Sequence, residues 1–333
     1  MKKNNRFAVV GAAIGMLALI LDTRTAFEGA KNGIVLCLST LIPSLFPFFL
    51  LSVFLTSSLS GQAIPALRSI ANACKIPVGA ESLFPISLLG GYPVGAQNIS
   101  ILYRQGHLSR MQSMRMLAFC NNAGPAFIFG ILGSMFSSRL MPWILWLIHI
   151  LSALLVGLLL PGSVQKNEVR IPIHRIRITD TLLQSIRSMA LVCSWVILIR
   201  IILSFAERWF LWIFPYPVQV LFAGVLELSN GCIKLAELES EGLRFIFAAG
   251  FLAFGGICVT LQTLCVADGI PMKLYFPGKI LQSSISILLA CLFQFIFPDD
   301  LRFRCDWIAV ISIMVLFLTL SFLHYSKKIV AFR

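Results

Sequence analysis

The chain has 333 residues, of which 58% are hydrophobic and 12% are charged, and its mean hydropathy is +0.89. Soluble domains carry about a quarter charged residues, so this composition excludes a soluble globular protein and predicts an all-α, polytopic membrane protein. The net charge of +13 does not indicate nucleic-acid binding, because the basic residues lie in short loops between apolar segments rather than in a stripe interleaved with aromatic residues.

The first apolar segment covers residues 7–21 and follows the basic sequence MKKNNR. A secretory signal peptide begins in the same way. No small-residue cleavage motif follows, however, and apolar segments continue along the chain. We therefore expect residues 1–31 to hold an uncleaved transmembrane helix whose N-terminus is cytoplasmic.

Seven further apolar segments are long enough to cross a hydrocarbon core about 30 Å thick. Together with residues 7–21 they predict about eight transmembrane helices. These seven segments are 32–58, 116–136, 140–160, 188–206, 244–267, 280–297 and 307–325.

Two more apolar segments, roughly 82–102 and 218–236, are interrupted by glycine and polar residues. The first contains GGYPVGAQ, and the second contains GVLELSNG. Each could be a transmembrane helix or a re-entrant hairpin that enters and leaves on one side. Backbone N–H and C=O groups must be paired in lipid, so an interrupted helix has to face protein or a water-filled cavity.

The distribution of Lys and Arg favours two hairpins. With both segments as hairpins, eighteen basic residues lie on the cytoplasmic side, including Arg115 and Lys279, and seven lie outside. If both segments were transmembrane helices, twelve basic residues would lie on the cytoplasmic side and thirteen outside, which the positive-inside rule disfavours. The seven outer residues are Arg24, Lys31, Arg139, Arg208, Arg244, Arg302 and Arg304.

This topology makes residues 32–136 and 188–267 inverted copies of each other. Each copy has a span, a hairpin and a returning span. Residues 137–187 connect them through a transmembrane helix and a basic cytoplasmic loop, and residues 268–333 supply C-terminal transmembrane helices. Inverted repeats with interrupted helices at the midplane are typical of secondary transporters.

The interruptions supply the candidate substrate-binding residues. Free peptide groups and amide side chains can bind a polar solute there, and the N-termini of half-helices favour anions. The alternative is that the glycines allow close helix packing and the amides join helices. The candidates are Gly91, Gly95, Gln97, Asn121, Asn122, Glu227, Asn230 and Gln262.

Glu227 is the only acidic residue that we place deep in the membrane, where a carboxylate costs about 2.5–3.5 kcal/mol. We expect it to carry a coupling proton, to bind a cation or to pair with Lys234. His149 is expected to be a packed histidine, and Arg200 is expected to extend to the interface.

No motif indicates catalysis or a cofactor. The sequence has no GxSxG, HExxH, P-loop or dinucleotide fingerprint. Its nine cysteines form no CxxC pair and no zinc-type spacing with histidine. We therefore expect no enzymatic activity, no catalytic residues, no metal and no cofactor.

Four motifs resemble those of a known family: GGYPVGAQ (90–97), FCNNAGPAFIFG (119–130), GVLELSNG (224–231) and FGGICVTLQ (254–262). They are similar to the sporulation integral membrane proteins of the YlbJ type, which carry two nucleoside recognition, or Gate, domains. The similarity covers about residues 32–290. It implies that residues 32–136 and 188–267 are Gate repeats, similar to the inverted hairpin repeats of concentrative nucleoside transporters.

The resemblance also implies a function. It indicates a membrane protein of spore formation that carries dipicolinate, a small aromatic dianion, from the mother cell towards the forespore. It implies binding roles for the residues in the matching motifs, which are Gly95, Gln97, Asn121, Asn122, Glu227, Asn230 and Gln262. The residues themselves do not distinguish a dianion from a neutral nucleoside.

The sequence thus predicts a multi-pass transporter of a small polar, anionic aromatic solute, with both termini cytoplasmic. It would act in the cell membrane, with the outer forespore membrane as one location. The alternatives are a non-transporting scaffold for spore-envelope assembly or a nucleoside transporter. The expected partners are the small-molecule solute and the lipid bilayer, and we expect no binding to nucleic acid. The sequence leaves open whether the protein forms a homo-oligomer or binds another membrane protein.

Overall fold

The computed structural model describes residues 2–59, 64–162 and 178–297, and within these ranges no residue is in a β-strand. This confirms the all-α prediction. The helices are α1 Lys2–Leu21, α2 Thr23–Leu36, α3 Ile42–Leu59, α4 Arg68–Ala73, α5 Leu83–Gly90, α6 Val94–Arg104, α7 Arg110–Phe119, α8 Pro125–Gly130, α9 Met141–Leu159, α10 Ile178–Trp209, α11 Tyr216–Leu226, α12 Leu228–Leu235, α13 Glu241–Phe254, α14 Gly256–Val266 and α15 Tyr275–Ile296.

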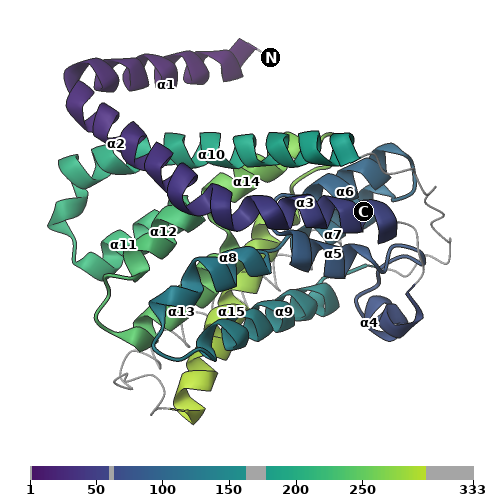
Figure 1. Cartoon of the computed structure of the whole chain (residues 1–333). Coiled ribbons are helices and arrows are strands. Elements are labelled where there is room, and N and C mark those ends of the chain that lie inside the picture. Colours follow the sequence, from purple (N-terminus) through teal and green to yellow (C-terminus); the bar gives the residue numbers. More distant parts are fainter. Residues whose placement is uncertain (1, 60–63, 163–177, 298–333) are drawn as a thin grey trace.

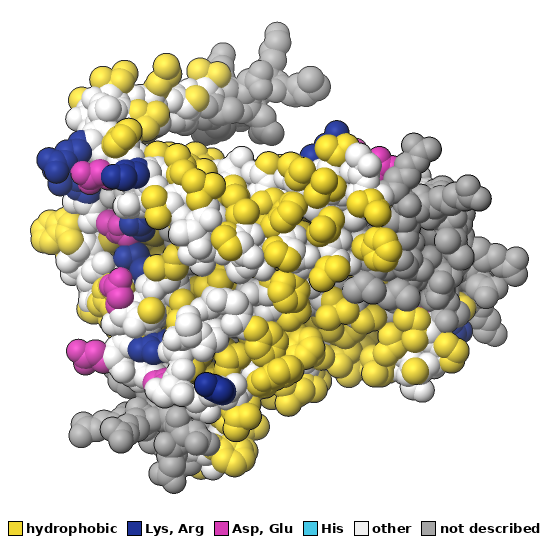
Figure 2. All heavy atoms as spheres, viewed as in Figure 1, with side chains coloured by type: hydrophobic (Ala, Val, Ile, Leu, Met, Phe, Trp, Pro, Cys, Tyr) yellow, Lys and Arg dark blue, Asp and Glu magenta, His cyan; other side chains and the backbone are white. Residues whose placement is uncertain are grey.

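Five helical segments are long and apolar enough to cross a membrane: Thr23–Leu51, Met141–Leu159, Ile178–Trp209, Glu241–Val266 and Tyr275–Ile296. In Figure 2, hydrophobic side chains cover most of the middle of the visible face, and acidic and basic side chains gather at its left edge. A surface of this kind is stable only against lipid. The protein is therefore a polytopic membrane protein, as predicted.

The predicted spans agree with these helices in part. The spans 140–160, 188–206, 244–267 and 280–297 lie in four of the five, although Gly255 breaks the third. The predicted span 32–58 begins nine residues after the helix does, since the helix starts at Thr23. The Asp22 carboxylate caps this N-terminus by accepting a hydrogen bond from the N–H of Thr25 at 3.2 Å.

Two other predicted spans differ more from the structure. Residues 116–136 do not form one helix, because α7 ends at Phe119 and a non-helical segment separates it from α8. The apolar part of α1, Val9–Leu21, is shorter than the ~20 residues that cross a bilayer. The predicted span 307–325 lies outside the described residues.

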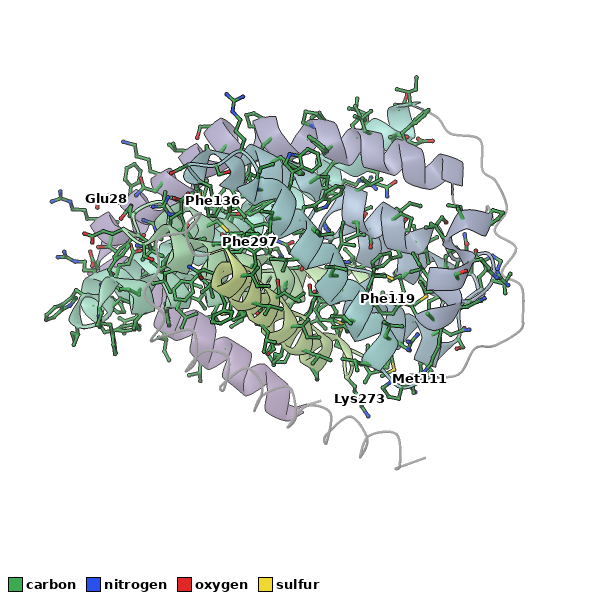
Figure 3. The ribbon with its side chains drawn as sticks, turned by 90° about the horizontal axis from the view of Figure 1, so that it is seen from below. Glu28, Met111, Phe119, Phe136, Lys273 and Phe297 are labelled. Carbon is green, nitrogen blue, oxygen red and sulfur yellow. The ribbon has the colours of Figure 1, made fainter. Side chains whose placement is uncertain are left out.

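The same order of elements occurs twice. The series α3, α5–α6, α7–α8 and α9 corresponds to the series α10, α11–α12, α13–α14 and α15. In Figure 1, α5, α6 and α7 lie at the right of the molecule and α11 and α12 at the left, so the two hairpins enter from opposite ends. In Figure 3, Glu28 of α2 lies near the left end, and Met111 of α7 and Lys273, after α14, lie towards the lower right.

Both interrupted segments turn back on themselves. A Cβ atom built on Gly231 of α12 would lie 2.2 Å from Cα of Gly224 in α11, and one built on Gly95 of α6 would lie 3.0 Å from Cβ of Ser87 in α5. In a continuous helix the two residues of each pair would be about 10–12 Å apart along the axis. We name α5–α6 hairpin 1 and α11–α12 hairpin 2.

Two basic residues that the charge count placed in cytoplasmic loops are buried instead. The Arg115 guanidinium donates hydrogen bonds to backbone carbonyls of Cys74, Gly157 and Leu160, so it joins α7 to the end of α4 and to α9. Lys279 lies in the interior on α15. Without these two residues the count is sixteen against seven, which still favours the hairpins.

Candidate functional site

The tips of the two hairpins pack against the breaks in the helices that follow them. A Cβ atom on Gly91, whose φ is +72°, would lie 3.0 Å from the backbone N of Gly124, between α7 and α8. A Cβ atom on Gly256 would lie 3.2 Å from Cα of Glu227, the residue that separates α11 from α12. Each repeat therefore brings two interrupted backbones into contact at one point.

Hairpin 1 also reaches across to the second repeat. The hydroxyl of Tyr92, at the tip of the hairpin, lies 3.2 Å from the backbone carbonyl oxygen of Leu252 in α13, to which it donates a hydrogen bond. The tip of hairpin 1 thereby contacts α13 just before its break at Gly255, so the four interruptions lie together.

A cavity lies where these interruptions meet. Three of the predicted site residues line it: Gly91, Glu227 and Gln262. Its walls also include several aromatic rings, those of Phe48, Phe49, Tyr92 and Phe127. The volume is about 50 Å³, which is room for a few water molecules but too little for an aromatic solute. An aromatic solute could therefore bind only after the hairpins move apart.

Glu227 forms the N-cap of α12. Its carboxylate accepts hydrogen bonds from the backbone N–H groups of Ser229 at 2.8 Å and Asn230 at 2.7 Å, and from the Asn230 side-chain amide at 2.8 Å. This arrangement stabilises a buried anion, because three donors and the helix dipole face it. The N-terminus of α12 is thus occupied by a carboxylate of the protein itself.

The expected alternative of a Glu227–Lys234 pair is wrong. The Lys234 ammonium pairs with the Glu207 carboxylate at 2.8 Å instead, and the Arg200 guanidinium also pairs with Glu207, at 3.3 Å. In the part of the chain that the structure describes, Glu227 forms no ion pair. A coupling-proton role and a cation-binding role remain as the two alternatives for this carboxylate.

The predicted asparagines of the first repeat connect helices. The Asn121 side chain accepts a hydrogen bond from the N–H of Ala96 at 3.3 Å, and its amide donates to the hydroxyls of Thr263 at 2.9 Å and Tyr275 at 3.1 Å. It therefore joins the start of α6 to α14 and α15.

Asn122 has a similar bridging position. Its amide donates to the carbonyl oxygen of Phe119 at 2.7 Å, and its own oxygen accepts from the Gln282 amide at 2.9 Å. The neighbouring N–H of Ala123 donates to Nε2 of His149 at 3.1 Å. The non-helical segment after α7 is therefore hydrogen-bonded to α9 through its backbone and to α15 through the Asn122 side chain.

The remaining two candidates lie away from the cavity. A Cβ atom on Gly95 would lie 2.0 Å from the carbonyl oxygen of Cys120, so this glycine allows α6 to approach the end of α7. The Gln97 amide donates a hydrogen bond to the Ser188 hydroxyl at 3.1 Å and joins hairpin 1 to α10.

Sequence reasoning missed Lys279, which is fully buried. Its ammonium donates to the Gln282 side-chain oxygen at 2.7 Å, lies 3.5 Å from the side-chain oxygen of Asn122, and lies 5.2 Å from the ring centroid of Tyr92. Within the described ranges no carboxylate pairs with it. An unpaired buried cation is costly, which makes a functional role the default.

Lys279 was missed because it lies at the boundary of an apolar segment, where a lysine is ordinarily in a loop. Its neighbour Gln282, three residues later, was the available signal, because both lie on one face of a helix. Tyr92 separates Lys279 from the cavity, since its ring contacts the ammonium and also lines the cavity.

The fold and site define a polytopic helical membrane protein in which two opposed hairpins and two broken helices surround a small cavity. The chain is similar to the sporulation integral membrane protein YlbJ of Bacillus subtilis (strain 168), with 23% identity over 85% of this chain and 81% of that protein. This similarity confirms the YlbJ-type resemblance that the four motifs predicted. No protein-family model matches the chain, and no solved structure matches it.

Proposed function

We propose that this protein carries a small aromatic carboxylate across a membrane during spore formation, and that dipicolinate is the solute. The observation that carries the proposal is the meeting of two hairpin tips and two helix breaks around one cavity. The name of its Bacillus subtilis relative supports the connection with sporulation.

The case for transport rests on the cost of interrupted helices. Non-helical backbone at membrane depth is retained where it is buried in protein or lines a cavity, and opposed half-helices around such a cavity are the usual architecture of a carrier site. The tip of hairpin 1 is linked to α13 by the Tyr92 hydroxyl, which lies 3.2 Å and 3.5 Å from the carbonyl oxygens of Leu252 and Ala253. Relative movement of the hairpins would open the cavity to either side in turn.

The case for an aromatic anion rests on the groups around the cavity. Aromatic rings line its walls, and the buried Lys279 amino group lies 5.2 Å from the ring centroid of Tyr92. Rotation of this ring would bring the ammonium into contact with a bound carboxylate. The amide of Gln262 is also at the wall and can donate a hydrogen bond to the same group.

Glu227 then takes the role of coupling residue. A carboxylate beside a bound dianion is strongly unfavourable unless it binds a proton, because like charges at close range disfavour ionisation. The solute and one proton would therefore occupy the cavity together. This predicts that acidification of the loading side increases uptake.

The test is uptake of labelled dipicolinate into proteoliposomes that contain the purified protein. We expect uptake by the wild-type protein, at least tenfold slower uptake for Gln262→Ala, and loss of the pH dependence for Glu227→Gln. The matched control is Glu28→Gln, which changes an exposed carboxylate that pairs with Arg24. Uptake of nucleosides instead would favour a nucleoside transporter, and no uptake of either by folded protein would favour a scaffold.

A further inference from the structure

A second, larger cavity lies between hairpin 1, α10 and α14. Its volume is about 500 Å³, within the range of small-molecule sites. Its lining comes from α6, from the first half of α10, and from the end of α14 and the loop after it. The polar side chains that line it are Gln97, Arg104, Gln184, Arg187, Ser188 and Asp268.

The charge in this cavity is positive. Arg104 and Arg187 supply two guanidinium groups, and Asp268 supplies one carboxylate. Neither arginine has an ion-pair or hydrogen-bond partner among the residues that the structure describes. A guanidinium binds a carboxylate through two parallel hydrogen bonds, so two free ones in a small cavity suit a ligand with two carboxylates. Asp268 opposes that binding and keeps it weak.

The second cavity adjoins the central one. Ser188 lines the second cavity, and Val192, one turn further along α10, lines the central cavity. On α14, Gln262 lines the central cavity and Val266, one turn later, lines the second. One helical turn is about 5.4 Å, so a thin wall separates the two spaces. Gln97 and Ser188 both line the second cavity, and the hydrogen bond between them at 3.1 Å joins hairpin 1 to α10.

We infer that the second cavity, which we name the vestibule, is a binding site for aromatic dicarboxylates, where the solute is held before hairpin 1 moves and admits it to the central cavity. The assignment of dipicolinate to the vestibule rests on the proposed function. The anion preference of the vestibule does not, because it follows from Arg104 and Arg187 alone. Separation of Gln97 from Ser188 is the step that would connect the two spaces.

Cys265 provides a native reporter, because its exposed thiol lines the vestibule. The experiment measures its modification in the purified full chain by a sulfonate-bearing and by a trimethylammonium-bearing thiosulfonate reagent, with the modified peptide identified by mass spectrometry. We expect the anionic reagent to react about tenfold faster than the cationic one, because a positive cavity concentrates anions. We also expect dipicolinate to slow the reaction.

The variant Arg104→Gln/Arg187→Gln should bring the two rates together and abolish protection by dipicolinate. The control Arg110→Gln changes an exposed arginine of the next helix that does not line the vestibule, and it should leave both results unchanged. Melting temperatures of both variants verify that they fold. Equal reagent rates in the wild-type protein, or an unchanged ratio in the double variant, would overturn the inference.

The labelling experiment requires no transport, so its result is separable from that of the uptake assay. A charge preference at Cys265 together with absent uptake would refute the carrier proposal and leave the anion site standing. If Cys265 reacts equally with both reagents but dipicolinate is still taken up, the solute reaches the central cavity by another route. That result would refute the vestibule and leave the carrier proposal standing.

Discussion

The substitution Gly231→Ala tests whether hairpin 2 is closed as the structure describes. The new methyl carbon would lie 2.2 Å from Cα of Gly224 and 2.7 Å from its backbone N. Non-bonded carbon atoms stay about 3.5–4.0 Å apart, so α11 and α12 must separate by more than about 1 Å. Neither obstructing atom belongs to a side chain that could rotate away.

Overpacking of this kind costs about 1–3 kcal/mol, and a clash between two backbones belongs at the upper end. At about 3 kcal/mol the melting temperature should fall by about 6–12 °C, at roughly 2–4 °C for each kcal/mol. The displaced tip would carry Glu227 away from Gly256, so uptake of dipicolinate should be lost as well. Thermal unfolding in detergent can be followed through reaction of the buried cysteines with a fluorogenic thiol reagent.

The matched control is Gly15→Ala in α1, where nothing lies within 4 Å of the new methyl group. It should leave stability unchanged or raise it by up to about 1 kcal/mol, because alanine is the better helix former. If Gly231→Ala melts at the wild-type temperature and transports normally, the two halves of hairpin 2 do not cross at this point and the closed geometry is refuted.

Four further predictions follow from single contacts. Lys279→Met should abolish dipicolinate uptake in proteoliposomes and lower the free energy of unfolding by about 1–3 kcal/mol, because it leaves the buried Gln282 oxygen without its donor; retained uptake would exclude a role for this lysine. Arg115→Met should lower unfolding free energy by about 3 kcal/mol or more, since it leaves buried carbonyls unpaired, and a wild-type melting curve would contradict this. Tyr92→Phe removes the hydroxyl that hydrogen-bonds to α13, so it should cost about 0.5–1.5 kcal/mol and speed the reaction of a thiol introduced into the central cavity by Ser229→Cys; equal reaction rates would show that this bond does not hold the tip. A thiol introduced by Gly106→Cys should react with impermeant reagents only from the cytoplasmic side, and outside reaction would overturn the hairpin topology.

The sequence predicts most of the fold because the decisive signals are local. Long apolar segments, the Gly-rich interruptions and the asymmetry of basic loops are readable without tertiary contacts. The exact ends of the helices are less readable. The helix that begins at Thr23 includes Lys31, whose charge suggested a loop, because a capping aspartate and packing against α10 extend it beyond its apolar part.

The site is less predictable, because the function of a polar residue at an interruption depends on which element lies opposite it. Asn121 and Asn122 have the same residue type and spacing that a binding site needs, yet their side chains are hydrogen-bonded to α6, α14 and α15. Lys279 lies far from the interruptions in sequence and reaches the site only through the packing of α15 behind Tyr92. Such long-range pairings leave no local pattern.

The central claim is that the hairpin tips enclose the place where the solute binds. Ser229, at the tip of hairpin 2, lines that cavity. The direct measurement is the rate at which a small alkylating reagent modifies the thiol introduced by Ser229→Cys, with and without saturating dipicolinate. The account predicts slow modification as the hairpins part, and at least tenfold slower modification when dipicolinate is bound. An identical rate with and without bound dipicolinate would contradict it.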